Sequence, residues 1–354
     1  MRVIGSACCA SAPDDELPLD ASNQPREPFH MLRAVMSEYN EIRPFIRISL
    51  SPRENFQGYI LRLSTENELK STILPTIFWK CERRSRTDAI RMLCTWTAST
   101  PENIKPLFVR HGRRAQGRRA WAPVPGYALC RSMIHPHARV CPACLAHDGI
   151  ADSAWSLRLY IGCSEHRTKL AEFCPSCGKA LLWNRRGIRT CVCGYDLAEI
   201  RTERLPDDQV ELMSMIRSAC SLFAARTATP RTPAELALPD LLKMIMLVSL
   251  DNACYWELGL WNCKRNANEL VRKAAKALTN WPHGIRTLLR RVLRGRADKT
   301  IRTAPAHGGR LIQAIKSRRQ AGLQWKGRAM VVKEAQIAVN GHYFSRLKLM
   351  SSYP

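Results

Sequence analysis

Eight side chains that commonly bind transition metals occur in four closely spaced pairs near the middle of the chain. Two pairs have the form C-x-x-C, one is C-x-x-H and the last is the tighter C-x-C; together they comprise Cys141, Cys144, Cys163, His166, Cys174, Cys177, Cys191 and Cys193. Residues spaced in this way lie on one tight turn and can point at the same ion, and a tetrahedral Zn²⁺ requires two such turns. Taken in order, the pairs predict a Cys₃His site followed by a Cys₄ site.

Both predicted sites have a full set of four protein ligands. A catalytic zinc usually keeps three protein ligands and leaves the fourth position for water. We therefore expect two structural Zn²⁺ ions, each adding on the order of 10 kcal/mol to folding. His135 and His137 precede the first pair and compete as ligands for that site, whereas Glu165, beside His166, is interpreted as a solvated turn residue.

Length and cysteine usage restrict the class of protein. The chain has 354 residues, 45% of them hydrophobic, which is enough for two or three small domains with buried cores. Its 15 cysteines are partly grouped at metal-ligand spacing, and no convincing signal peptide precedes them, so reduced thiols are favoured over a secreted disulfide framework. No apolar run reaches the length of about 18 residues needed to span a bilayer. These features predict a cytoplasmic protein with no membrane partner.

The charge points to a polyanionic partner. The chain carries 55 Lys and Arg against 30 Asp and Glu, a formal net charge of +25, and such an excess attracts nucleic acid. Two basic segments are candidate contacts: residues 109–119, interpreted as a flexible linker, and the polar side of a helix near residue 290. Their candidate nucleic-acid-binding residues are Arg110, Arg113, Arg114, Arg118, Arg119, Arg286, Arg290, Arg291 and Arg294.

Elements before the metal-ligand pairs are predicted to be helical. Residues 1–45 lack periodicity and are expected to form a loosely ordered tail. Ser51, followed by Pro52 and Glu54, predicts a helix that begins with a capping box. Its buried face recurs at i, i+3, i+4 and i+7 and comprises Phe56, Tyr59, Ile60 and Leu63. Further apolar patterns predict a helix through Ile90, Leu93 and Cys94 and a short one from Thr100 to Ile104.

Elements after the pairs are also predicted to be helical. A second capping box, from Thr232 to Glu235, leads into the apolar residues Leu241, Leu242, Ile245 and Met246. A helix near residue 290 combines the basic side named above with an apolar stripe formed by Ile285, Leu288, Leu289, Val292 and Leu293. Residues 331–349 are interpreted as helix, turn and helix.

These elements predict a mainly α fold. We expect a tail at residues 1–45 and a small helix-turn-helix-like domain with its basic linker at residues 46–120. A double zinc-finger or zinc-ribbon module follows at residues 121–205, and a helical domain with a basic face occupies residues 206–354.

Several motifs together resemble the TniQ family of transposon target-selection proteins. They are the stretch from Arg139 to Ala146, Trp155, C-x-x-H at Cys163, C-P-x-C-G at Cys174 and C-x-C-G-Y-D-L at Cys191, with flanking similarity at residues 51–63 and 280–285. The resemblance implies an N-terminal helix-turn-helix region, a double zinc finger that uses the eight ligands named above, and a helical C-terminal part. It further implies a non-enzymatic adaptor that reads DNA or follows another targeting complex, and that recruits an AAA+ ATPase. The ATPase then activates a transposase; some relatives dimerise. RNA or a nucleic-acid-guided targeting complex is the alternative partner to DNA.

Two other classes of protein are weighed against this one. A zinc-ribbon DNA-binding transcriptional regulator would have the same charge and metal sites. A zinc deaminase or nuclease would need an open zinc position or clustered carboxylates, and neither an H-x-E motif followed by C-x-x-C nor an H-E-x-x-H motif is present.

Overall fold

The computed structural model describes four main stretches, residues 46–105, 133–220, 230–249 and 266–288, and ten single positions: Val124, Gly126, Tyr127, Leu129, Arg290, Met330, Lys333, Glu334, Gln336 and Ile337. All of them belong to one compact unit, Pro44–Pro354. The predicted tail at residues 1–45 and the basic linker at residues 109–119 lie outside the described residues. Most of the predicted helix-turn-helix at residues 331–349 does so too.

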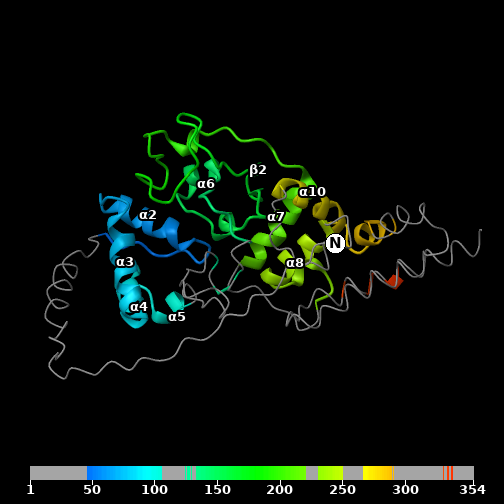
Figure 1. Ribbon diagram of the computed structural model, residues 1–354, viewed down its shortest axis with the longest axis horizontal. Helices are drawn as coiled ribbons and strands as arrows, with labels where there is room; N and C mark the ends of the chain where they lie inside the picture. Colours follow the sequence, from blue (N-terminus) through cyan, green and yellow to red (C-terminus); the bar gives the residue numbers. More distant parts are fainter. Residues whose placement is uncertain are drawn as a thin grey trace, which may run out of the picture. The chain divides into compact units, whose positions relative to one another are not determined.

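The N-terminal described stretch is helical, as predicted. It contains α2 (Phe56–Glu66), α3 (Ile73–Arg84), α4 (Arg86–Thr97) and the short α5 (Pro101–Ile104), drawn from blue to cyan in Figure 1. The predicted face of α2 is buried, with Tyr59 and Leu63 fully enclosed. Ser85 ends α3 and caps α4 through its hydroxyl, which accepts a hydrogen bond from the Asp88 amide at 3.2 Å. Whether these helices read DNA as a helix-turn-helix stays a prediction.

The start of α2 differs from the prediction. The helix is capped by Asn55 instead of Ser51, and its Oδ1 accepts a hydrogen bond from the Gly58 amide at 2.6 Å. Glu54 is fully buried and forms an isolated β-bridge with Asp152. Its carboxylate binds Arg62 at two positions, 2.9 and 2.6 Å away. This long-range pairing holds the backbone extended where the local capping signal would start a helix.

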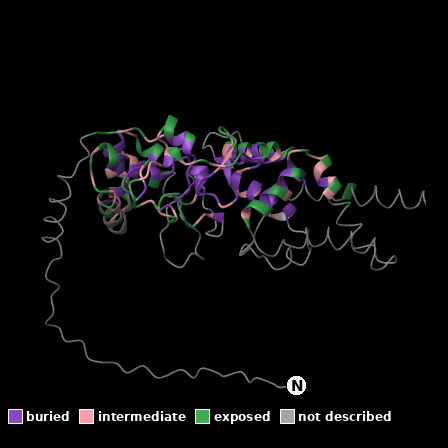
Figure 2. Cartoon of the chain, turned by 90° about the horizontal axis from the view of Figure 1, so that it is seen from above, coloured by how far each residue is buried: buried purple, intermediate pink, exposed green. Residues whose placement is uncertain are grey.

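The central stretch has little regular secondary structure. It contains α6 (Pro142–His147), the 3₁₀ turns η3 (Ser153–Ser156) and η4 (Leu197–Glu199), and the antiparallel strands β1 (Gly162–Cys163) and β2 (Thr168–Lys169). Buried apolar side chains, led by Trp155 and Tyr160, continue into one core shared with the C-terminal helices. Figure 2 shows this buried material along the inner sides of the elements. Most of this stretch therefore consists of turns and irregular backbone.

Three helices pack together in the C-terminal part: α7 (Asp207–Cys220), α8 (Leu238–Ser249) and α10 (Ala267–Leu278). On α8, Leu241, Leu242 and Ile245 are buried as predicted. Residues 283–288 are also helical; Ile285 is buried and Leu288 packs against the core. The other predicted members of that stripe, Leu289, Val292 and Leu293, lie outside the described residues.

The second capping box closes a different element from the one predicted. The Thr232 hydroxyl donates to the Glu235 carboxylate at 3.0 Å, but Thr232 precedes the 3₁₀ turn η5 (Pro233–Glu235), and α8 begins only at Leu238. Pro239 explains the break. In a continuous helix from Pro233, the ring of Pro239 would clash with the carbonyl of Glu235. In a helix that begins at Leu238, Pro239 lies in the first turn, where proline is tolerated.

Candidate metal centre

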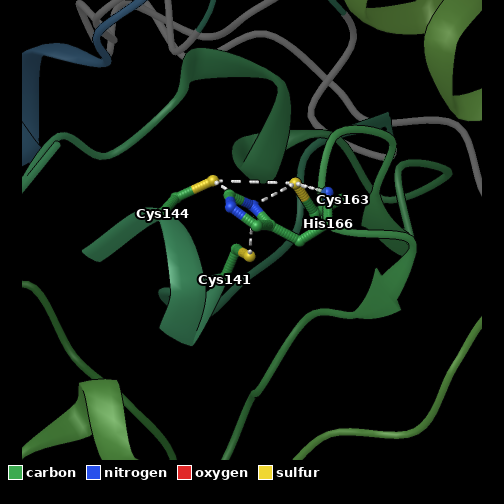
Figure 3. Close-up of side chains that lie close together, drawn as sticks. All are labelled: Cys141, Cys144, Cys163 and His166. Atoms are coloured by element: carbon green, nitrogen blue, oxygen red, sulfur yellow. Dashed lines mark hydrogen bonds between the residues drawn. The ribbon is translucent and has the colours of Figure 1, made fainter. Parts of the chain in front are cut away.

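Four of the predicted ligands meet in a first cluster. Cys141 caps α6, Cys144 lies within that helix, Cys163 ends β1, and His166 follows in the turn to β2. The three sulfur atoms approach His166 Nδ1 at 3.6, 3.2 and 3.5 Å, and the sulfur atoms of Cys144 and Cys163 are 3.6 Å apart. Figure 3 shows the four side chains converging on one point.

These separations match a tetrahedral zinc site. With Zn–S bonds of about 2.3 Å and Zn–N bonds of about 2.0 Å, ideal geometry places two sulfurs about 3.8 Å apart and a sulfur and a nitrogen about 3.5 Å apart. The close sulfur contacts in the cluster are therefore the separations expected of four ligands that could hold a single ion. The donor set fits zinc.

The other four predicted ligands form a second cluster. The sulfur atoms of Cys174 and Cys193 are 3.7 Å apart and those of Cys177 and Cys191 are 3.9 Å apart, and all four lie within 4.8 Å of one another. Each pair is followed by a glycine in the left-handed region, Gly178 at φ 67° and Gly194 at φ 97°, where a side chain would be strained. The tight C-x-C pair thus reaches the same site as the C-x-x-C pair.

In each cluster one thiol is shifted towards the thiolate form, whereas the pKa values of the neighbouring thiols Cys141, Cys144 and Cys191 are raised. Hydrogen bonds from Cys141 and Cys144 hold the pKa of Cys163 far below its usual range. A backbone hydrogen bond at Tyr195 is the main cause that lowers the pKa of Cys193 to about 6. The thiolate is the metal-binding form of cysteine. The ten cysteines described, which include all seven predicted ligands of this type, are free of disulfides.

Two residues near the first cluster have other roles. His135 Nδ1 contacts the carbonyl of His137 at 3.1 Å, and its Nε2 faces Glu172 at 3.4 Å, so the competing histidines are not part of the cluster. Glu165 is an exposed turn residue, as expected, and its carboxylate also forms ion pairs with Arg53 at 3.2 Å and with Arg217 at 2.5 Å.

Glu165 thereby connects the first cluster to the helical parts on both sides. Arg217, on α7, also pairs with the buried Asp152 at 2.8 Å. The backbone reinforces the connection, because the Ser153 amide donates to the carbonyl of Arg53 at 2.6 Å and the Asn55 amide donates to that of Ala151 at 2.9 Å. Sequence reasoning missed this network because its members are distant in the chain and match no motif.

The candidate nucleic-acid contacts are only partly described. Arg286 pairs with the buried carboxylate of Glu334 at 2.5 Å, while Arg290 is exposed. The remaining candidates lie outside the described residues: Arg110, Arg113, Arg114, Arg118, Arg119, Arg291 and Arg294. Nucleic-acid contact by any of them stays a prediction.

The described part of the chain is thus mostly helical and is organised around two clusters of four metal-ligand side chains. In comparison with known families, residues 45–170 match the TniQ model. The resemblance seen in the motifs is confirmed for this stretch, which includes the N-terminal helices and the whole first cluster. No curated protein matches the chain significantly. Among the described residues, no helix is both long and apolar enough to cross a membrane.

Proposed function

We propose that both clusters bind structural Zn²⁺, the first through Cys141, Cys144, Cys163 and His166 and the second through Cys174, Cys177, Cys191 and Cys193. The support is the agreement between the donor separations and tetrahedral geometry. Four protein ligands around each ion leave no position for an activated water. In this role the metal supplies folding free energy to a stretch poor in helices and strands.

We propose further that the chain is a non-enzymatic adaptor that selects target sites for DNA transposition. The observation that carries this proposal is the TniQ match over residues 45–170, which joins the helical stretch to the first metal cluster. That match favours transposition over the alternative of a zinc-ribbon transcriptional regulator. The adaptor binds nucleic acid, or a nucleic-acid-guided complex, and recruits an AAA+ ATPase, which in turn activates a transposase.

The net charge of +25 supports the nucleic-acid part of the proposal. The basic segment at residues 109–119 contains no acidic residue, and Arg is well suited to grip phosphate oxygens with two parallel hydrogen bonds. If a partner complex chooses the target, this protein does not need to contact the DNA bases directly. Self-association into a dimer is compatible with both routes.

The test is a transposition assay in cells that carry the parent element, with insertion sites mapped by sequencing. Deleting the gene for this protein should scatter or abolish the insertions. Expressing the unmodified protein should restore the original distribution of insertion sites. Affinity purification of the tagged chain should recover the ATPase, and cells that lack the ATPase gene provide the control. An unchanged distribution of insertions after deletion would refute the adaptor role.

A further inference from the structure

Arg185 is charged and yet almost completely buried, with 1% of its surface exposed. Its guanidinium donates hydrogen bonds to three backbone carbonyls, those of Leu182 at 2.9 Å, Gly187 at 3.1 Å and Ile188 at 2.9 Å. The Trp183 ring lies beneath it, 5.3 Å from ring centre to guanidinium carbon. Carbonyl dipoles satisfy its N–H groups but do not neutralise its charge.

A buried charge without an opposite charge is unfavourable, because the interior solvates ions poorly. In the described part of the chain, no carboxylate forms an ion pair with Arg185. Arg139 offers a comparison: it is equally buried and also donates to backbone carbonyls, but the carboxylate of Glu172 lies 3.7 Å from it. The negative charge that compensates Arg185 must come from elsewhere.

The second metal cluster can supply that charge. Arg185 lies in the loop between two ligand pairs, and Ile188, whose carbonyl accepts its hydrogen bond at 2.9 Å, is three residues before Cys191. Burial lowers the pKa of Arg185 to about 10, and the charge of Cys191 opposes that shift. Four thiolates around one Zn²⁺ carry a net charge of −2, whereas three thiolates and a neutral histidine carry −1. The arginine that lacks a carboxylate is therefore the one in the loop that leads to the more negative cluster.

We propose that Arg185 is the counter-ion of the Cys₄ site, where its charge stabilises the metal-bound cluster and its three hydrogen bonds fix the loop that delivers Cys191. This role rests on the zinc binding proposed above. It makes Arg185 a positioning residue of the second site alone. The first site has Arg139 and Glu172 in its neighbourhood and does not depend on Arg185.

The test compares Arg185→Met with Arg186→Met, a neighbouring arginine that is exposed and forms no ion pair among the described residues. Each purified chain is titrated with a chelator while native mass spectrometry counts the bound zinc ions. Replacing Zn²⁺ with Co²⁺ assigns each loss to a site, because the absorption of a four-thiolate site differs from that of a Cys₃His site. Arg185→Met should bind one of its two ions about 10- to 100-fold more weakly, as is typical for loss of a partner outside the ligand shell.

A third variant, Arg185→Lys, separates charge from hydrogen bonding. It keeps the positive charge but loses the planar fork, so it should hold the second ion more tightly than Arg185→Met. If Arg185→Lys and Arg185→Met weaken zinc binding at the second site equally, the proposal of charge compensation is wrong. Equal retention of both ions by Arg185→Met and Arg186→Met also refutes the role of Arg185, as does simultaneous loss of both ions. An unmodified chain that carries no bound metal would instead refute the zinc proposal itself.

Discussion

Replacing Arg217 with Met should strongly destabilise the protein, because Arg217 neutralises a buried carboxylate. Asp152 is 7% exposed, and it lies against Arg217 Nε at 2.8 Å. Burial raises the pKa of Asp152 even though Arg217 and the Ala154 amide act to lower it. Methionine keeps most of the aliphatic volume of Arg217, so the substitution removes chiefly the charge and its hydrogen bonds.

The expected loss is about 3–4 kcal/mol in the free energy of unfolding. Removing one member of a buried ion pair typically costs about 3–5 kcal/mol, and the side chains of Arg217 and Asp152 are only 17% and 10% exposed. The second pair of Arg217, with Glu165, adds little, since the Glu165 side chain is 42% exposed and such pairs contribute about 0–1 kcal/mol. Most of the loss is the penalty of leaving Asp152 ionised and unpaired.

This deficit should shrink as the pH falls from 7 towards 5. Without Arg217 the pKa of Asp152 rises further above the ordinary aspartate value, so the folded state binds the proton more tightly than the unfolded state does. Protonation then favours folding, and the variant regains stability as the pH falls towards the raised value. Metal release at low pH affects the variant and the unmodified protein alike, so the difference between them isolates Asp152.

Urea unfolding followed by tryptophan fluorescence measures these effects at each pH. The matched control is Arg189→Met, which breaks a largely exposed pair with Asp196 and should cost at most about 1 kcal/mol. Adding Asp152→Asn to Arg217→Met should recover part of the loss, because the buried charge is then absent. The reasoning would be refuted if Arg217→Met cost no more than Arg189→Met, or if its deficit grew on acidification.

Three further outcomes are expected. Gly58→Ala should destabilise the docking of α2 by about 1–3 kcal/mol, because the new Cβ would lie 2.4 Å from that of Ala151; thermal unfolding measures the change. Cys174→Ser should lose one of two bound zinc ions and abolish target-site selection, which metal analysis and insertion mapping test; one ion lost with selection intact would show that the second site is dispensable. DNA binding, measured by fluorescence anisotropy, should weaken steeply with added salt because bound arginines release counterions, and an affinity indifferent to salt would contradict a basic interface.

The metal ligands could be predicted from the sequence because the two members of each ligand pair are close together in the chain. A pair such as Cys141 and Cys144 encodes both the turn and the donors, and the structure groups the eight residues as the order of the pairs predicts. The buried face of α2 could be predicted for a similar reason, since helical periodicity is apparent within a few residues of sequence. Both predictions needed no knowledge of the rest of the chain.

The first residues of the helices could not be predicted in the same way. At Ser51 and at Thr232 the local capping signal is present, yet the helices begin later. In the first case, the bridge from Glu54 to Asp152 holds the backbone extended; in the second, Pro239 prevents a continuous helix. Arg217 was missed because its partner is set by packing: it meets Asp152 across 65 residues of sequence. Arg185 was missed because its partners are nearby backbone carbonyls, which no side-chain motif reveals.

Ion pairing inside the protein also refines the search for a nucleic-acid surface. Each ion pair between an arginine and a carboxylate, such as Arg286 with Glu334, neutralises one positive and one negative charge. Ion pairs of this kind therefore leave the net charge of +25 unchanged. That surplus must reside on basic residues without acidic partners; the segment at residues 109–119 is rich in arginine and contains no acidic residue of its own. Arg286 is thus a poor probe of DNA contact, because its loss would leave Glu334, 8% exposed, without its charge partner and destabilise the fold. Exposed Arg290 is the more informative substitution on the same helix, since a loss of affinity there would report contact and not unfolding.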